Sequence, residues 1–324
     1  MSMIEVKNLS KRFGDLEAVK GIFFEVAQGE IFGFLGPNGA GKSTSISMLA
    51  TILSPTSGDA FVNGQSVLHN RNGVRASIGL VFQDPSLDDR LTAMENLRFH
   101  AQLYGVPKSE FKKRAQEVLE LVDLSDRAQD LIRTFSGGMK RRLEIARGLI
   151  HYPRVLFLDE PTIGLDPQTR SHLWEYILRL KREKGMTIFM TTHYMNEAEY
   201  CDRIAIIDQG TIVALDTPAA LKKRLGGDVV RMQSLNKEAL VAELKRRYGT
   251  EVHVDGESVL IEVENGESFL PKLFQDLQTT IRSIELRKPT LDDVFLALTG
   301  RAIRAEEASS KDQFRQHARM RGLR

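Results

Sequence analysis

Gly36-Pro37-Asn38-Gly39-Ala40-Gly41-Lys42-Ser43 is the most informative part of the 324-residue sequence, because it matches the phosphate-binding loop pattern GxxxxGK[ST]. The apolar run at residues 31–35 predicts a buried strand before it, and residues 42–52 predict a helix after it. In that setting the backbone N–H groups face an anion, Lys42 reaches the β- and γ-phosphates, and the Ser43 hydroxyl is a ligand for Mg²⁺. The motif predicts a nucleoside triphosphate site; the alternative is a glycine-rich turn without a ligand.

The composition is that of an ordinary globular protein. A net charge of +2 with 27% charged residues does not favour extensive nucleic-acid binding, so no nucleic-acid partner is expected. The single cysteine, Cys201, excludes an intramolecular disulfide and is typical of a reducing compartment. The first residues carry no signal-peptide pattern, and no apolar run approaches the ~18 residues needed to cross a bilayer. We therefore expect any membrane role to depend on a partner.

Strand-like and helix-like segments alternate over residues 1–226, which predicts an α/β domain with a mostly parallel sheet. A helical insertion is expected at about residues 84–135, because residues 92–123 carry two helical patterns broken at Gly105-Val106-Pro107. The expected strands are residues 4–9, 23–27, 31–35, 77–82, 155–158, 187–192 and 204–208.

Gly226-Gly227-Asp228 predicts a hinge, after which residues 227–300 form a small accessory domain. Its segments follow the order β-α-β-β-α-β, which suggests a ferredoxin-like α+β fold closed by a helix at residues 291–298. Residues 301–324 hold seven Lys and Arg against three Asp and Glu, a local balance of +4. We expect a flexible, solvated tail there, and contact with anionic lipid headgroups is the alternative.

The strand expected at residues 155–158 ends in two adjacent carboxylates, Asp159 and Glu160. Ligands of open α/β sheets lie at the carboxyl ends of the strands, so both acids are expected beside the phosphates. Asp159 would hold Mg²⁺ directly or through water, and Glu160 would orient and deprotonate the attacking water. Taken alone, the pair could also be a capped strand end.

A second candidate anion site lies in the stretch Phe135-Ser136-Gly137-Gly138-Met139-Lys140-Arg141-Arg142. Ser136 is a favourable N-cap for a helix that continues to Ile150. The flanking glycines would leave the N–H groups of that helix N-terminus open to an anion. A plain helix cap without a ligand is the alternative for these residues.

In their order, these motifs resemble the ATPase subunits of ATP-binding-cassette (ABC) transporters over residues 3–225. Ser136-Gly137-Gly138 resembles the family signature Leu-Ser-Gly-Gly-Gln, from which the chain departs at Phe135 and Met139. The resemblance implies that two copies pack head to tail, so that Ser136 and Gly138 act on the ATP held by the other copy. ATP would hold this dimer together and hydrolysis would loosen it.

The resemblance assigns further positions. Gln83 corresponds to a glutamine that touches Mg²⁺ and the attacking water, and His193 to a histidine that contacts the γ-phosphate. Phe13 stands where the family usually has a tyrosine that stacks on adenine, although core packing is an alternative for this ring. Gly164-Leu165-Asp166 resembles a loop that crosses the dimer interface.

The resemblance also implies complete sets of site residues. The implied nucleotide-binding residues are Phe13, Gly36, Pro37, Asn38, Gly39, Ala40, Gly41, Lys42, Ser43, Thr44, Ser136, Gly137 and Gly138. The implied metal ligands are Ser43, Gln83 and Asp159, and the implied catalytic residues are Glu160, His193 and Gln83.

Three features resemble the daunorubicin and multidrug-resistance type of exporter ATP-binding protein. They are the Ser-Gly-Gly-Met signature, the extra domain after residue 228 and the segment PTLDDVFLALTG at residues 289–300. The resemblance implies a Mg²⁺-dependent ATPase at the cytoplasmic face of the membrane, which drives a separate membrane permease for drug, antibiotic, lipid or ion export. The alternative is a soluble ABC-type ATPase that acts as a nucleotide-gated binding or target-protection module without transport.

Overall fold

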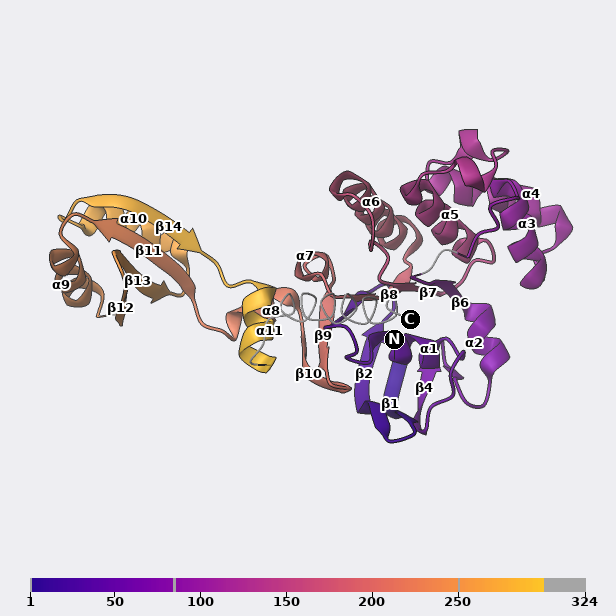
Figure 1. The fold of residues 1–324 in the computed structure, drawn as a ribbon, viewed down its shortest axis with the longest axis horizontal. Helices are drawn as coiled ribbons and strands as arrows, with labels where there is room; N and C mark the ends of the chain where they lie inside the picture. Colours follow the sequence, from indigo (N-terminus) through magenta and orange to yellow (C-terminus); the bar gives the residue numbers. More distant parts are fainter. Residues whose placement is uncertain (1, 84–85, 250, 300–324) are drawn as a thin grey trace, which may run out of the picture. The chain divides into compact units, whose positions relative to one another are not determined.

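A computed structural model describes residues 2–83, 86–249 and 251–299 (Figure 1). The expected tail at residues 301–324 and the first residues of the helical insertion therefore lie outside the described residues. The chain divides into two compact units between Thr217 and Pro218. No helix in the described ranges combines the length and the apolar character that a membrane span requires.

The first unit is built on a six-stranded sheet. Its strands, in spatial order, are β10 (Thr211–Asp216), β9 (Arg203–Asp208), β3 (Ile31–Leu35), β8 (Thr187–Thr192), β7 (Val155–Asp159) and β6 (Ile78–Val81). All neighbours are parallel except the β9–β10 hairpin, which confirms the mostly parallel α/β sheet. Strands β3, β7 and β8 are buried along their whole length, as expected where both faces of a sheet are covered.

A second, antiparallel sheet packs in the same unit. Its order is β2 (Leu16–Ala27), β1 (Ser2–Phe13), β4 (Ser57–Val62) and β5 (Gln65–Ser66). The core between the sheets is rich in aromatic rings: Phe24 of β2 lies 5.3 Å from Phe32 of β3 and 5.8 Å from Phe189 of β8, between ring centroids. This close-packed aromatic core supports the strands whose ends carry the site.

Helices complete the first unit: α1 (Lys42–Leu49), α2 (Arg71–Ser77), α3 (Ala93–Leu103), α4 (Lys108–Leu121), α5 (Gly137–Leu149), α6 (Pro167–Lys184) and α7 (Met195–Ala198), with 3₁₀ turns at Ser125–Arg127 and Ile132–Thr134. Figure 1 shows α3 to α6 on the opposite side of the large sheet from the small sheet. The expected helical pair around Gly105 is confirmed as α3 and α4. The strand expected to start at residue 77 starts at Ile78, because Ser77 ends α2.

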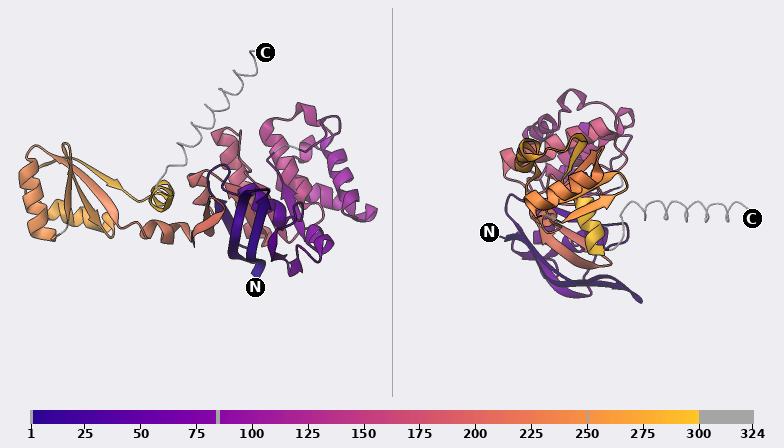
Figure 2. Two further views of the ribbon diagram at one scale, coloured as in Figure 1. Left: turned by 60° about the horizontal axis from the view of Figure 1, so that its bottom comes forward. Right: turned by 90° about the vertical axis from the view of Figure 1, so that its left-hand side faces the viewer.

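The second unit is a sheet with two helices on one face. It contains α8 (Pro218–Lys223), β11 (Asp228–Ser234), α9 (Lys237–Tyr248), β12 (Val252–Asp255), β13 (Ser258–Val263), α10 (Gly266–Asp276), β14 (Ile281–Arg287) and α11 (Leu291–Thr299). The antiparallel order β12-β13-β11-β14 confirms the ferredoxin-like arrangement. Figure 2 gives two further views of the ribbon. Its core is formed by buried side chains of the sheet and helices: Val230, Met232, Leu240, Leu244, Val259, Ile261 and Leu273.

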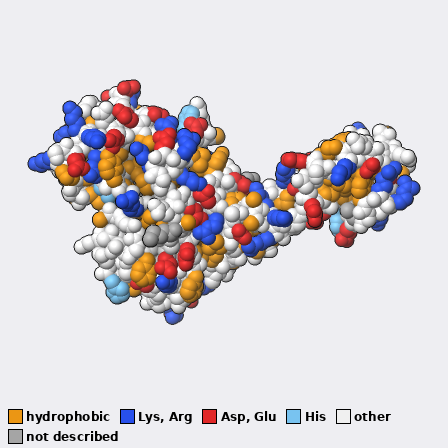
Figure 3. Space-filling view, turned by 180° about the vertical axis from the view of Figure 1, so that it is seen from behind, with side chains coloured by type: hydrophobic (Ala, Val, Ile, Leu, Met, Phe, Trp, Pro, Cys, Tyr) orange, Lys and Arg blue, Asp and Glu red, His pale blue; other side chains and the backbone are white. Residues whose placement is uncertain are grey.

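Charged side chains of both signs are interspersed over the face shown in Figure 3. This distribution agrees with the net charge of +2 of the whole sequence. Neither unit presents a large field of one sign on that face.

Candidate active site

The phosphate-binding loop joins the buried strand β3 to helix α1. Gly41 is the N-cap of α1 and has a φ of 104°, a left-handed conformation that glycine adopts without strain. A Cβ at this position would lie 2.6 Å from the carbonyl oxygen of Ala18, so a larger residue would displace the backbone. No side chain caps this helix within the described residues. The N–H groups of its first turn therefore face an anion-binding position.

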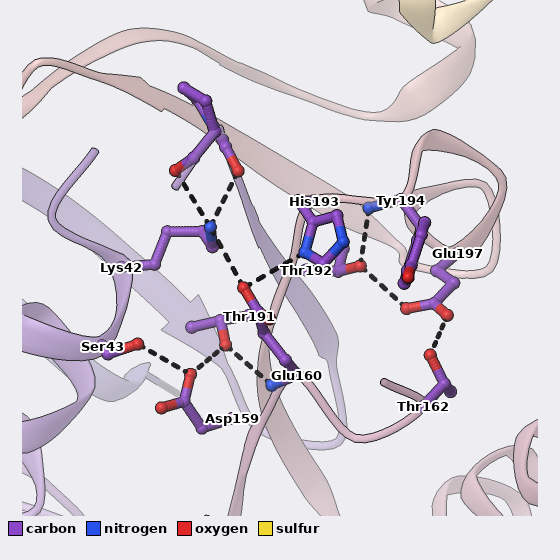
Figure 4. A network of polar contacts seen from close by, with 12 residues as sticks. Lys42, Ser43, Asp159, Glu160, Thr162, Thr191, Thr192, His193, Tyr194 and Glu197 are labelled. Atoms are coloured by element: carbon purple, nitrogen blue, oxygen red, sulfur yellow. Dashed lines mark hydrogen bonds and ion pairs between the residues drawn. The ribbon is translucent and has the colours of Figure 1, made fainter. Parts of the chain in front are cut away.

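Lys42 is the first residue of α1 and is buried, with 4% of its surface exposed. Its Nζ donates hydrogen bonds to the carbonyl oxygens of Gly36 at 2.8 Å and Pro37 at 3.1 Å. The same ammonium lies 3.2 Å from Oε1 of Glu160 (Figure 4). The loop thus holds a positive charge directly beside the helix N-terminus.

Asp159 is the last residue of β7 and pairs with Thr191 in the neighbouring strand β8. Its Oδ1 accepts hydrogen bonds from the Ser43 hydroxyl at 3.3 Å and from the Thr191 hydroxyl. The described residues contain no group of three or more His, Cys, Asp or Glu side chains that could hold a metal. Mg²⁺ characteristically takes one or two carboxylates and completes its shell with waters and phosphates, and an Asp–Ser oxygen pair fits that requirement.

Glu160 follows with a φ of 45°, which is unusual for a residue other than glycine. Such a conformation costs about 1 kcal/mol, and it is held because the Glu160 N–H donates to the carbonyl and hydroxyl oxygens of Thr191. This turn directs the carboxylate between Lys42 and His193, whose Nδ1 lies 3.2 Å from Oε1. Burial acts to raise the pKa of Glu160, but the contacts with His193 and Lys42 outweigh it and lower the pKa below its usual value. The carboxylate is therefore ionised at neutral pH.

The segment that carries His193 is fixed by a buried carboxylate that the sequence analysis missed. Glu197 is 1% exposed and accepts hydrogen bonds from Thr192 Oγ1 at 2.8 Å and from the Thr162 hydroxyl. The Thr192 hydroxyl in turn accepts from the Tyr194 N–H at 3.0 Å. Burial raises the pKa of Glu197 despite these contacts. One feature of the sequence could have indicated that Glu197 is buried: this acid lies in the same short helical segment as the apolar residues Met195 and Ala198.

A pocket of about 490 Å³ opens beside the loop. It is lined by Phe13, Leu16, Ala18, Asn38, Gly39, Gly41, Lys42, Ser43, Thr44, Gln83, Glu160 and Ile163. The structure thus brings Phe13 and Gln83, far apart in the sequence, to the phosphate-binding loop. Phe13 is 47% exposed, with the Lys11 ammonium 5.1 Å from its ring centroid, so it is not a core residue. The size and mixed lining suit a nucleotide-sized ligand.

Ser136, Gly137 and Gly138 do not line this pocket. Ser136 caps α5 as expected, because its Oγ accepts from the Met139 N–H at 3.2 Å. A Cβ on Gly138 would lie 2.3 Å from Cγ2 of Thr169, so close packing against α6 also requires glycine there. Asp166, in the segment expected to cross a dimer interface, caps α6 by accepting from the Thr169 N–H at 3.0 Å.

Comparison with known sequences decides the family. The family model "ABC transporter" matches residues 19–163, and "ATP-binding protein DrrA1-3-like, C-terminal domain" matches residues 217–299. The linearmycin resistance ATP-binding protein LnrL of Bacillus subtilis is 42% identical, over 93% of this chain and all of that protein. The chain belongs to the ABC transporter ATP-binding proteins. This ABC protein is also 39% identical to the daunorubicin/doxorubicin resistance ATP-binding protein DrrA of Streptomyces peucetius, over 92% of both chains.

Solved structures agree with this assignment. The ABC protein resembles the dimeric post-hydrolysis ATP-binding cassette MJ0796 bound to ADP and Pi, with a TM-score of 0.60 and 29% identity. That match covers 66% of this chain and 98% of the solved one. The cassette cbiO1 of Clostridium perfringens, part of the ABC transporter complex cbiONQ, gives a TM-score of 0.64 at 29% identity and covers 76% of this chain and 96% of that one. The chain is accordingly an ABC-type ATPase subunit with a DrrA-like C-terminal domain.

Proposed function

We propose that this ABC protein is the Mg²⁺-dependent, ATP-hydrolysing motor of an exporter. The observation that carries the proposal is the ionised Glu160, held between Lys42 and His193 at the mouth of the phosphate-binding loop. The names of its relatives, which are resistance proteins for linearmycin and daunorubicin, support export as the process that hydrolysis drives.

The chemistry follows from the positions of the side chains. Lys42 and the N-terminus of α1 neutralise the β- and γ-phosphates, and Phe13 offers a ring face for the adenine. Glu160 takes a proton from the attacking water, and His193 beside it keeps that water in line. Bound Mg²⁺ supplies further neutralisation of the phosphate charge, and Ser43, Asp159 and Gln83 are the residues that would hold it.

A second copy of the chain completes the site in this proposal. Ser136 and Gly138 begin a helix whose N–H groups suit an anion, yet they do not line the pocket of their own chain. They would therefore act on the nucleotide of the partner copy. The dimeric state of the similar cassette MJ0796 supports this arrangement.

The transported compound passes through a partner in this proposal. The motor sits at the cytoplasmic face of the membrane and drives a separate permease chain, in keeping with the transporter complex that contains cbiO1. Residues 1–226 form the motor domain and residues 227–300 an accessory domain. The cargo belongs to the drug, antibiotic, lipid or ion classes, and the permease selects among them.

Affinity purification of a Glu160→Gln protein from its own cells, in mild detergent with Mg-ATP, tests the proposal. The substitution removes the base and keeps the binding residues, so we expect a stable ATP-bound dimer together with a multi-helix membrane chain, identified by mass spectrometry. Glu25→Gln, an exposed change of the same chemistry in β2, is the control and should hydrolyse ATP like the wild type. If only soluble proteins co-purify, the proposed role in transport is wrong. If the Glu160→Gln protein is a monomer in saturating Mg-ATP, the proposed ATP-bound dimer is wrong.

Nucleotide binding is tested separately with Lys42→Ala. Loss of a buried ammonium beside the phosphates should weaken Mg-ATP binding, measured by titration calorimetry, by at least about tenfold. Unchanged affinity would refute the assignment of the phosphate-binding loop.

A further inference from the structure

Helix α5 carries a buried ion pair that the proposed chemistry does not use. Arg141 is 6% exposed and Glu144 is 1% exposed, and Nη1 of the arginine lies 3.1 Å from Oε2 of the glutamate. Burying two charges is unfavourable unless hydrogen bonds satisfy their remaining donors and acceptors. The positions of those other partners therefore indicate why the pair is there.

The guanidinium donates three further hydrogen bonds to the turn that carries the catalytic carboxylate. Nε donates to the carbonyl of Pro161 at 2.7 Å, and Nη2 donates to the carbonyls of Asp159 at 3.1 Å and Glu160 at 3.4 Å. An arginine fork is planar and rigid, so it holds these three consecutive carbonyls at set positions relative to one another. This is the turn in which Glu160 adopts its left-handed backbone conformation.

The same helix also holds the backbone on both sides of Gln83. Nη1 of Arg141 donates to the carbonyl of Phe82, and Oε1 of Glu144 accepts from the Ser86 N–H at 2.8 Å. Arg147, farther along α5, donates to the Ser86 carbonyl at 2.6 Å. Both segments that would supply groups to the attacking water are thus attached to one helix.

We propose that Arg141 is a positioning residue for hydrolysis, which fixes the Glu160 turn and the end of strand β6 relative to helix α5. The inference rests on the proposed function, because it assigns Arg141 a role through Glu160. Helix α5 begins at Ser136, so Arg141 also links the residue that would act on the partner's nucleotide to the base of its own chain. Without the guanidinium, the Glu160 turn is free to relax and its carboxylate moves away from the water. Among the described residues, none of these hydrogen bonds of Arg141 reaches residues 36–43, and Lys42 keeps its own hydrogen bonds to the carbonyls of Gly36 and Pro37. Nucleotide binding is therefore largely preserved.

Steady-state ATP hydrolysis by the full-length chain tests this inference with Arg141→Gln and Arg141→Lys. We expect kcat of the glutamine variant to fall about ten- to hundredfold, the size expected for a slightly misplaced catalytic group, while KM for Mg-ATP stays within about threefold. Lysine should restore little, because one ammonium cannot span three carbonyls. The control is Arg179→Gln in α6, which removes a guanidinium that reaches Leu121 and Asp123 and should leave kcat within about twofold.

Glu144→Gln gives an independent arm in case Arg141→Gln does not fold. It removes the charge that orients the guanidinium but keeps an oxygen for the Ser86 N–H, and we expect the same fall in kcat with KM preserved. Wild-type kcat in a folded variant of either residue would overturn the inference, as would a KM that rises in step with the fall in kcat. If the wild-type chain itself hydrolyses no ATP, the proposed function fails and this inference fails with it. If the wild type hydrolyses ATP and the Arg141 and Glu144 variants hydrolyse it equally well, this inference is wrong but the proposed function stands.

Discussion

Two glutamates near His193 have their pKa values shifted in opposite directions, and the difference shows how the residue environment assigns roles. The pKa of Glu160 is lowered because Lys42 and His193 outweigh the effect of its burial. The pKa of Glu197 is raised because its burial outweighs the hydrogen bonds from Thr162 and Thr192, which act to lower the pKa. The first is suited to accept a proton from water, whereas the second is suited to hold a loop.

Replacing Glu197 with glutamine tests this distinction through pH. A carboxyl whose folded pKa is raised binds its proton more tightly in the folded state, so wild-type stability falls as the pH rises above the unfolded value of about 4.3. Glutamine does not titrate. The Tm of Glu197→Gln minus that of the wild type should therefore increase as the pH rises from about 4 to 7, measured by differential scanning fluorimetry. A difference that is flat or that falls with pH would contradict the raised pKa.

At the scale of the residue, the sequence predicted the groups that belong to linear motifs and missed those that depend on tertiary contacts. Ser43 and Asp159 come together because β3 and β7 are parallel strands that end at one edge, a rule that can be applied to a sequence. Glu197 belongs to no motif, and Arg141 lies in the stretch 135–142, whose pattern assigns it no role. The backbone carbonyls that accept from Arg141 lie 18 to 59 residues away along the chain, and the partners of Glu197 lie up to 35 residues away, so only the folded backbone reveals these contacts.

Among the elements, helix α5 begins at Ser136, which is either a plain helix cap or a residue that acts on a partner's nucleotide. Two substitutions of Ser136 distinguish these roles. Ser136→Ala should cost about 1 kcal/mol of stability and reduce hydrolysis, since it removes the cap and the hydroxyl together. Ser136→Asp keeps a favourable cap and therefore stability, but it places a carboxylate where the γ-phosphate of the second copy would lie. We expect hydrolysis and ATP-dependent dimerisation to fail in the aspartate variant, measured by phosphate release and light scattering. Wild-type values in that variant would favour the plain cap.

One carboxylate anchors helix α9 to the loop between α10 and β14. Glu243 accepts hydrogen bonds from the N–H groups of Gln278 and Thr279 at 3.0 Å each, which lowers its pKa to about 2. A lowered folded pKa adds stability above the unfolded value of about 4.3, and that stability is lost as the pH falls toward 2. Glu243→Gln should therefore destabilise the second unit by about 2 kcal/mol at pH 7, and by less at pH 3, in urea unfolding. A penalty that does not shrink with acid would contradict this account.

The elements that were predicted well have a single strong periodicity, and those that were missed do not. Strand β3 and helix α5 follow uninterrupted apolar or amphipathic patterns bounded by glycine or an N-cap. Strand β1 extends beyond the expected residues 4–9, because shifts in its pairing register with β2 break the two-residue alternation. Strands β4 and β10 escaped prediction since β4 starts on polar residues and β10 is only partly buried.

Across the whole molecule, each compact unit has a hydrophobic cluster of its own among the described residues: one includes Phe32 and Phe189 of the first unit, and the other includes Val230 and Leu273 of the second. The pocket beside the phosphate-binding loop is lined only by residues of the first unit. A nucleotide bound there should therefore stabilise one unit without direct effect on the other. Mass action sets the size of the effect, because a ligand that binds only the folded state stabilises it by RT ln(1 + [L]/Kd).

Scanning calorimetry of the full-length chain tests this separation. At about one hundred times its Kd, a non-hydrolysable ATP analogue with Mg²⁺ adds about 2.7 kcal/mol, which raises the Tm of the first unit by roughly 5–10 °C. The transition of the second unit should stay where it is, and Glu243→Gln should move only that transition. Lys42→Ala should abolish the nucleotide-dependent shift and leave both transitions otherwise in place. A single transition that moves as a whole with nucleotide would mean that the units unfold together, and the second unit would then respond to the state of the ATP site.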